Sequence, residues 1–120
     1  MALLNKSEHQ IQKDFVKWLE TQDIMYTMIP NELGIFKRSP DYFKAINSFF
    51  HLGFKPGLPD MLLIVNDQLV FIEFKVGKGK LSPIQKNWID NLKKTGAHCF
   101  VCYSTEEAKQ AVDNIAKSKD

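Results

Sequence analysis

The chain has 120 residues, of which 44% are hydrophobic and 25% are charged, as expected for one globular domain over residues 1–120 and not for a disordered or fibrous protein. No apolar run approaches the roughly 20 residues of a membrane span. The N-terminus turns polar after Leu4, so we expect a cytoplasmic protein with no signal peptide and no membrane partner. The formal net charge of +2 does not by itself indicate nucleic-acid binding.

Turn residues and hydrophobic spacing divide the chain into elements in the order α, β, α, β, β, α, β, α. The predicted helices begin at Ser7, at Ser39-Pro40, at Ser82-Pro83 and at Ser104, and Gly53 and Gly96 end the second and third of them. The predicted strands span 24–29, 61–65, 68–76 and 97–103, with loops over 31–38 and 77–80. This order predicts an α/β fold in which helices flank a central mixed sheet of about four strands.

Each predicted helix carries an apolar face, and some begin with a capping box. The boxes are Ser7 with Gln10, Ser82 with Gln85, and Ser104 with Glu107. The inward residues are expected to be Ile11, Phe15, Trp18 and Leu19 in the first helix, Phe43, Ile46, Phe49 and Phe50 in the second, Ile84, Trp88 and Leu92 in the third, and Ala108, Ala111, Val112 and Ile115 in the last.

Cys99 and Cys102 have the spacing of a C-x-x-C motif, which occurs in zinc and redox sites. In a strand, however, an offset of three residues places two side chains on opposite faces. The sequence has no second Cys/His pair to complete a zinc site. We therefore expect both cysteines to be buried core residues.

The hairpin around Asn66-Asp67 determines which residues face each other. If these two residues form the whole turn, Val65 pairs with Gln68. The same register places Asp60 across from Glu73, with their Cβ atoms about 5 Å apart. A turn longer by one residue would offset this pair, and a bulge could restore it.

Two carboxylates facing each other on a sheet repel, and Glu73 lies in the apolar run VFIEFKV, where burial should raise its pKa. A divalent cation would relieve both problems, and oxygen donors suit Mg²⁺. Lys75, two residues further on, projects from the same face as Glu73. A structural ion pair of Lys75 with Glu73 or Asp60 is the alternative interpretation.

Glu8 lies at an angle within the apolar stripe of the first helix, which indicates an inward-facing acid. Acids in the first turn also interact favourably with the helix dipole. The two interpretations carry equal weight.

Three motifs carry a resemblance: GLPD at 57–60, FIEFK at 71–75 and GKLSPIQKNW at 79–88. Together they resemble the VRR-NUC family of the PD-(D/E)xK nuclease superfamily, from Glu8 to about Tyr103. The resemblance implies a restriction-endonuclease-like core. The helix around Phe43 to Phe50 is not part of the core that the superfamily shares.

The resemblance also implies roles for single residues. Asp60, Glu73 and the backbone carbonyl of Phe74 would hold Mg²⁺ or Mn²⁺, with no organic cofactor. Lys75 would orient or activate the attacking water. Glu8 would complete the metal shell through water. Gln85 matches the family's helix glutamine and would steady Lys75 or a phosphate, although its capping box is an equally good explanation.

Lysines near this site are candidates for holding the DNA backbone. Between Lys75 and Lys94, six residues are basic and only Asp90 is acidic. The candidates are Lys55, Lys78, Lys80 and Lys86. Such contacts would position DNA without reading its sequence. A solvated surface is the ordinary alternative.

The sequence thus predicts a metal-dependent DNA endonuclease, homodimeric and selective for branched DNA such as four-way (Holliday) junctions. Small stand-alone members of this family resemble junction-cutting dimers and often come from phages and bacteria. Phenylalanines at 36, 43, 49, 50 and 54 could form a dimer patch or extra core against the sheet. The alternatives are a DNA-binding domain of the same fold without catalysis, and an ordinary α/β domain with a structural ion pair.

Overall fold

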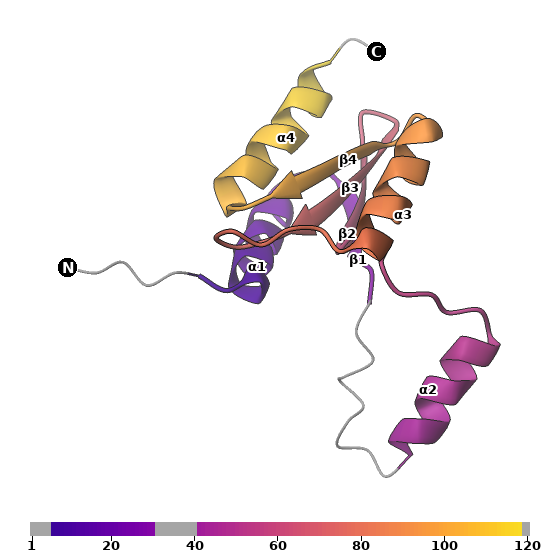
Figure 1. The fold of residues 1–120 in the computed structure, drawn as a ribbon. Helices are drawn as coiled ribbons and strands as arrows, with labels where there is room; N and C mark the ends of the chain where they lie inside the picture. Colours follow the sequence, from indigo (N-terminus) through magenta and orange to yellow (C-terminus); the bar gives the residue numbers. More distant parts are fainter. Residues whose placement is uncertain (1–5, 31–40, 119–120) are drawn as a thin grey trace.

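The computed structural model describes residues 6–30 and 41–118 (Figure 1). Its elements are α1 (Glu8–Leu19), β1 (Met25–Met28), α2 (Tyr42–His51), β2 (Met61–Val65), β3 (Gln68–Phe74), α3 (Pro83–Lys94), β4 (His98–Cys102) and α4 (Thr105–Lys117). Their order is the predicted one. The predicted loop over 31–38 and the helix start at Ser39-Pro40 lie outside the described residues, and α2 begins at Tyr42.

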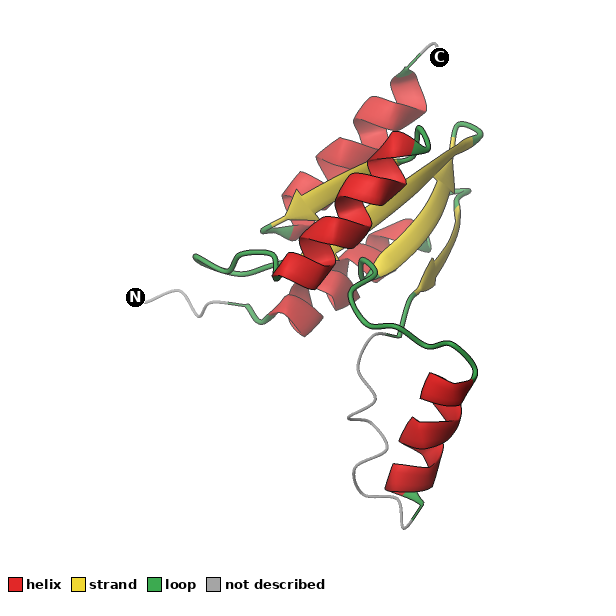
Figure 2. Ribbon diagram, turned by 45° about the vertical axis from the view of Figure 1, so that its right-hand side comes forward, coloured by secondary structure: helices red, strands yellow, loops and turns green. Residues whose placement is uncertain are grey.

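The strands form one sheet in the order β1-β2-β3-β4. β1 is antiparallel to β2, β2 is antiparallel to β3, and β3 is parallel to β4. Helices α1 and α4 cover one face and α3 covers the other, while α2 lies apart from these layers (Figures 1 and 2). This arrangement confirms the predicted α/β fold with a mixed central sheet.

The main core lies between the sheet and the α1/α4 pair. Ile72 and Phe74 of β3 are fully buried there, and the ring of Phe74 meets that of Phe15 edge-on with centroids 5.7 Å apart. The predicted inward residues of α4 are all buried. No helix among the described residues has the length and apolar character needed to cross a membrane.

The β2–β3 hairpin has the predicted register. Val65 pairs with Gln68, and the ladder continues to Met61 opposite Ile72. Asn66 and Asp67 both have positive φ, 53° and 61°. Positive φ at both central residues is what a two-residue type I′ turn requires. The turn therefore sets the register that brings the next residue before β2, Asp60, toward β3.

Helix α2 differs from its expected environment. None of its residues is buried, and Phe43 is 77% exposed. The prediction that its apolar residues pack inward is wrong, as is the extra core against the sheet for Phe43, Phe49 and Phe50, which are exposed; Phe36 lies outside the described residues. Both faces of the sheet already carry other helices, which leaves α2 no core to join (Figure 2).

Three smaller predictions need correction. Ile84 of α3 is 54% exposed, whereas Ile89 is buried, because the first turn of α3 borders an open cleft. Cys102 is buried but Cys99 only partly so, and both are free thiols. Two predicted capping boxes are half formed: Ser7 accepts from the Gln10 N–H but the Gln10 side chain donates to Asp14, and Ser104 accepts from the Glu107 N–H but the Glu107 carboxylate accepts from the Tyr103 N–H.

Candidate active site

Asp60 is held at the end of the sheet by contacts to both neighbouring strands. Its backbone carbonyl accepts a 2.7 Å hydrogen bond from the Ile29 N–H, just beyond β1. Its side-chain Oδ2 accepts another 2.7 Å bond, from the Phe74 N–H at the end of β3. Because the N–H and C=O of one strand residue point to the same side, the Phe74 carbonyl also leaves the strand toward Asp60.

Glu73 is 3% exposed, and it is the one buried charged residue in the described parts of the chain. Its neighbours Ile72 and Phe74 face the α1/α4 core, so alternation turns Glu73 and Lys75 toward the α3 face. There Glu73 Oε2 lies 3.7 Å from Lys75 Nζ and accepts a 3.3 Å hydrogen bond from Gln85 Nε2.

These contacts leave the carboxyl pair with excess negative charge. Burial raises the pKa of Glu73 to about 7, and the charge of Asp60 adds to the shift although Lys75 opposes it. Burial also raises the pKa of Asp60, with the Phe74 N–H working against it. The predicted Glu73–Lys75 ion pair is present, but it does not balance two carboxylates.

Gln85 forms the predicted capping box, and its side chain also reaches Glu73. Its Oε1 accepts from the Ser82 N–H at 2.9 Å while Ser82 Oγ accepts from the Gln85 N–H, which completes the capping box of α3. With the oxygen engaged, the amide nitrogen faces Glu73. In this structure Gln85 thus contacts the Glu73 carboxylate, where the resemblance implied Lys75 or a phosphate.

Glu8 borders the same cleft as Asp60 and Glu73, and its charge raises the pKa of both. Within residues 6–30 and 41–118, no three His, Cys, Asp or Glu side chains are grouped closely enough to hold a metal ion. Glu8 thus borders the cleft together with the pair, and its role in holding a metal ion stays a prediction.

The carboxyl pair opens into a cleft of about 780 Å³. The chain segments that line it are residues 8–9, 12–13 and 16 of α1, residues 26 and 28–30, residues 56–57 and 60–61, Glu73 and Lys75, and residues 82 and 84–85 at the start of α3. Sequence reasoning missed His9, Gln12 and Lys13. Only Gln12, four residues from Glu8 and on the same side of the helix, could have been found from helical spacing.

The segment before Asp60 is fixed by close packing against α3. A Cβ atom at Gly57 would lie 2.3 Å from Ile84 Cγ2 and 2.7 Å from Trp88 Cδ1, and its φ is +111°. The Trp88 indole N–H also donates to the Pro56 carbonyl at 3.0 Å. The start of α3 thus positions both Asp60, through this segment, and Glu73, through Gln85.

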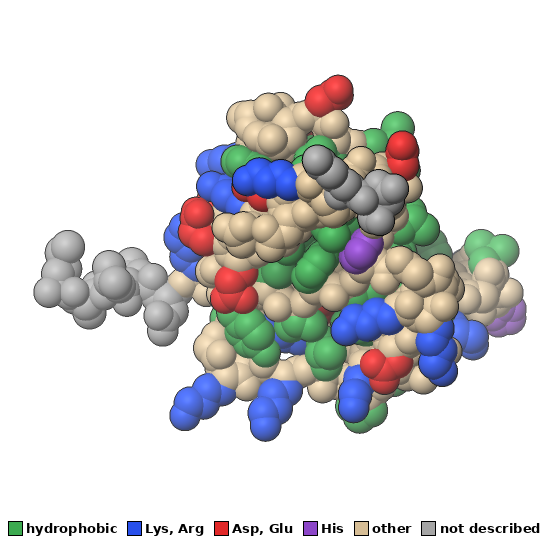
Figure 3. Space-filling view, turned by 90° about the horizontal axis from the view of Figure 1, so that it is seen from above, with side chains coloured by type: hydrophobic (Ala, Val, Ile, Leu, Met, Phe, Trp, Pro, Cys, Tyr) green, Lys and Arg blue, Asp and Glu red, His purple; other side chains and the backbone are tan. Residues whose placement is uncertain are grey.

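The predicted DNA-binding lysines lie outside the cleft. Lys55, Lys78, Lys80 and Lys86 are all at the surface, and none of them lines it. On the face seen in Figure 3, basic side chains gather along the lower edge with little acid among them, and basic and acidic side chains are interspersed over the rest. Their role stays a prediction.

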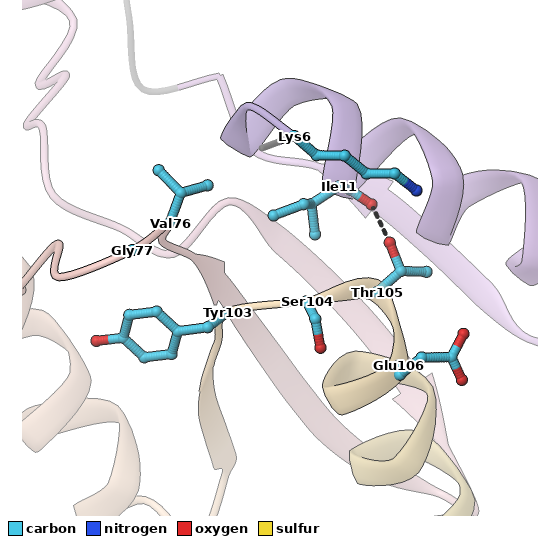
Figure 4. A pocket seen from close by; sticks show the side chains of 8 residues that line it. All are labelled: Lys6, Ile11, Val76, Gly77, Tyr103, Ser104, Thr105 and Glu106. Carbon is cyan, nitrogen blue, oxygen red and sulfur yellow. Dashed lines mark hydrogen bonds between the residues drawn. The ribbon is translucent and has the colours of Figure 1, made fainter. Parts of the chain in front are cut away.

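A second pocket, of about 430 Å³, lies between the starts of α1 and α4 (Figure 4). Thr105 Oγ1 donates to the Ile11 carbonyl there at 3.0 Å and links the two helices. The Tyr103 hydroxyl donates to the Gly79 carbonyl at 2.8 Å. That bond ties down the basic loop between Lys78 and Lys80, and the pocket shares no lining residue with the carboxyl cleft.

Two acidic residues and a lysine lie at one end of a mixed sheet, and helices cover both faces of this sheet. This arrangement defines a restriction-endonuclease-like core. The family model of the VRR-NUC domain matches residues 6–106, and the chain belongs to this nuclease-type family. A solved structure titled "VRR_NUC domain protein" superposes with a TM-score of 0.74 at 20% identity, covering 96% of this chain and 92% of that one. Another, "VRR_NUC domain", gives 0.63 at 19% identity, covering 90% and 97%. Comparison with curated proteins gives no match.

Proposed function

We propose that the protein is a Mg²⁺- or Mn²⁺-dependent DNA endonuclease that hydrolyses phosphodiester bonds. The observation that carries the proposal is the carboxyl pair of half-buried Asp60 and buried Glu73, which lies beside Lys75 in an open cleft. Burial without a balancing charge disfavours such a pair unless a cation binds there. Perturbed carboxyl groups in a cleft are typical of functional sites.

The donor set fits a hard divalent cation. Two carboxylates and the Phe74 carbonyl offer only oxygen atoms, which Mg²⁺ and Mn²⁺ prefer. When bound, the cation would offset charge on the scissile phosphate and lower the pKa of a water. Glu8, across the cleft, would reach this group through water.

The chain's own residues then have distinct tasks. The Lys75 ammonium, 3.7 Å from Glu73, would hold the phosphate or the attacking water by electrostatic attraction. The Gln85 amide donates to Glu73 and so fixes its rotamer. The Phe74 N–H does the same for Asp60. Fixed positions lower the entropic cost of aligning the reacting groups.

The direct test is incubation of linear, flap and four-way-junction DNA with Mg²⁺, Mn²⁺ or EDTA. We expect products with either metal and none with EDTA. The alternative function, a DNA-binding domain without catalysis, predicts binding in gel shifts and intact DNA under every condition. That second outcome would overturn the proposed activity.

We further propose that the enzyme is a homodimer that prefers branched DNA. Coordinated cutting of two strands needs two sites, which two-fold symmetry supplies. Helix α2 offers an interface, since Phe43 and Leu52 beside it are 77% and 82% exposed and nothing described in this chain covers them. Light scattering at several concentrations should give a dimer for the wild type and a monomer for Phe43→Ser/Leu52→Ser. A wild-type monomer throughout overturns the dimer.

Branch preference is tested separately, at one salt concentration because phosphate-driven affinity depends steeply on salt. Faster cleavage of the junction than of the linear duplex is expected, and equal rates contradict the preference. The lysines at 55, 78, 80 and 86 would hold phosphates. Neutralising any one should lower the salt slope of binding by somewhat less than one, whereas Lys17→Ala on α1 should leave the slope unchanged.

A further inference from the structure

One wall of the carboxyl cleft is apolar although it is open to solvent. Tyr26 and Met28, alternate residues of β1, line this wall together with Val16 of α1, and Met28 is 57% exposed. The Tyr26 hydroxyl donates to Glu20, which fixes the orientation of the ring. We name these three residues the apolar wall. Exposed apolar side chains grouped in a cleft are typical of ligand-binding sites.

The apolar wall adjoins the acidic pair through the backbone. Met28 pairs with Met61, the residue directly after Asp60, so Met28 lies on the α1 face of the sheet and Asp60 on the α3 face, and both line the one cleft. The next residue, Ile29, donates its N–H to the Asp60 carbonyl at 2.7 Å. The wall therefore begins about one residue from the contact that holds Asp60. Helix α1 also borders the cleft with Gln12 and Lys13, which can donate hydrogen bonds.

A ligand suited to both halves of this cleft must carry an anionic group and a flat apolar group side by side. A nucleotide within a DNA strand has this chemistry, because a phosphate and a base follow each other along the chain. The cleft volume, about 780 Å³, lies in the usual range of roughly 300–1,000 Å³ for pockets that enclose small molecules. Stacking on an aromatic ring accepts any base, since every base has a π-face.

We propose that the apolar wall receives one unstacked nucleobase of the strand whose phosphate lies at Asp60, Glu73 and Lys75. This inference rests on the proposed nuclease function and specifies its substrate: a strand with an unpaired nucleotide beside the cut. Extruding a base costs least where it is already unpaired. The cleft thus favours branch points and single-stranded ends over intact duplex through the base itself.

The test is a double-mutant cycle between the wall and the base. One side of the cycle is Met28→Ala, with Tyr26→Leu as a second variant that removes the ring. The other side is DNA in which one base at a time, along the strand near the cut, is replaced by an abasic site. Affinity is measured by fluorescence anisotropy with Ca²⁺ in place of Mg²⁺. Met25→Ala is the matched control, because Met25 lies on β1 and is 74% exposed but does not line the cleft.

For the wild type we expect one abasic position to weaken binding by about tenfold, the size of a lost base–aromatic stack. Met28→Ala and Tyr26→Leu should each weaken binding to intact DNA. Their affinity should fall little further when the DNA carries that abasic site, because the protein substitution and the missing base remove the same contact. Met25→Ala should behave as the wild type. If the effects of the protein substitution and of the abasic site on affinity multiply independently at every position, the base site is overturned. Cleavage of DNA by the wild type would still support the nuclease function. A wild type that neither binds nor cuts DNA overturns both.

Discussion

The Asp60 carboxylate accepts a 2.7 Å hydrogen bond from the backbone N–H of Phe74, the residue that follows Glu73. The side chain of the first acid is therefore anchored to the main chain of the strand that carries the second. Since a backbone donor cannot be changed by substitution at position 74, except by proline, the spacing of the two acids depends on the sheet and not on another side chain. This relationship shapes the predictions that follow.

Asp60→Asn and Glu73→Gln should each lower cleavage on the order of 10³-fold or more, because a bound cation supplies several kcal/mol of charge stabilisation. Both variants should fold, since the asparagine that replaces Asp60 keeps an acceptor oxygen for the Phe74 N–H. Circular dichroism and gel-based cleavage measure the two effects. Asp67→Asn, in the hairpin turn, is the matched control and should cut normally. Normal cutting by either site variant would remove that residue from the site.

Lys75→Ala should reduce turnover by about 10²- to 10⁴-fold, the usual contribution of a positioned proton-transfer or charge-stabilising group. Mn²⁺ affinity should change far less, because an ammonium is not a metal ligand. Calorimetry is best done near pH ~8.5, since the Lys75 charge lowers the pKa of Glu73 and its loss would otherwise weaken the metal site at neutral pH. If metal affinity collapses together with turnover even there, the role given to Lys75 is wrong.

The metal-free protein should lose stability as the pH rises. The pKa of Glu73 is raised from 4.5 to about 7 in the folded state, so the native state holds a proton that the unfolded state has released. The stabilisation is complete below pH 4.5 and is lost as the pH rises through about 7, by up to a few kcal/mol. Urea denaturation in EDTA at about pH 5 and about pH 8 measures it.

Glu73→Gln provides the comparison for this pH dependence. It should flatten the change and be more stable than the wild type at the higher pH. An unchanged dependence in the variant would assign the effect to another group. Metal affinity of the wild type should rise over the same pH range, because ligation requires the proton to leave.

Gly57→Ala should destabilise the protein and impair cleavage. The added Cβ would meet Ile84 and Trp88 at 2.3 and 2.7 Å, and the left-handed backbone adds strain. Gly96→Ala separates the two causes, since Gly96 has φ +93° but open space around its Cβ position. The control should lose about 1–2 kcal/mol from strain alone. Thermal melts should show a clearly larger loss for Gly57→Ala, and equal losses would contradict the packing argument.

The carboxyl pair could be predicted from sequence because local rules fix it. The Asn66-Asp67 turn sets the register, and the alternation of β3 turns Glu73 away from the core. The burial of Glu73 followed from its apolar neighbours. Predicting the pair did not require knowing how distant segments of the chain pack together. It required only the pairing of two strands joined by the shortest possible turn.

Features that depend on where the sheet ends could not be predicted. Helical spacing assigned Ile84 an inward position, but Ile84 lies against Gly57 of the loop before β2 and borders the cleft. The apolar face of α2 was recognised correctly, whereas its lack of a covering layer was not. His9 and Lys13 look like ordinary exposed helix residues in the sequence, and only the position of α1 beside the sheet brings them to the cleft.

The two-residue turn at Asn66-Asp67 has a consequence for engineering this domain. Exposed loop tips are normally the best places to insert a tag or to open the chain for circular permutation. Here one added residue would slip the hairpin, and a slip of one position exchanges the two faces of a strand. Asp60 would then point to the opposite side of the sheet from Glu73, about 20 Å from the insertion at the rise of an extended strand. The surface position that looks most permissive is thus the one where length must be conserved. Glycine should be accepted at Asp67, with φ near +61°, whereas Asn66 donates its side-chain amide to the Ile115 and Ser118 carbonyls.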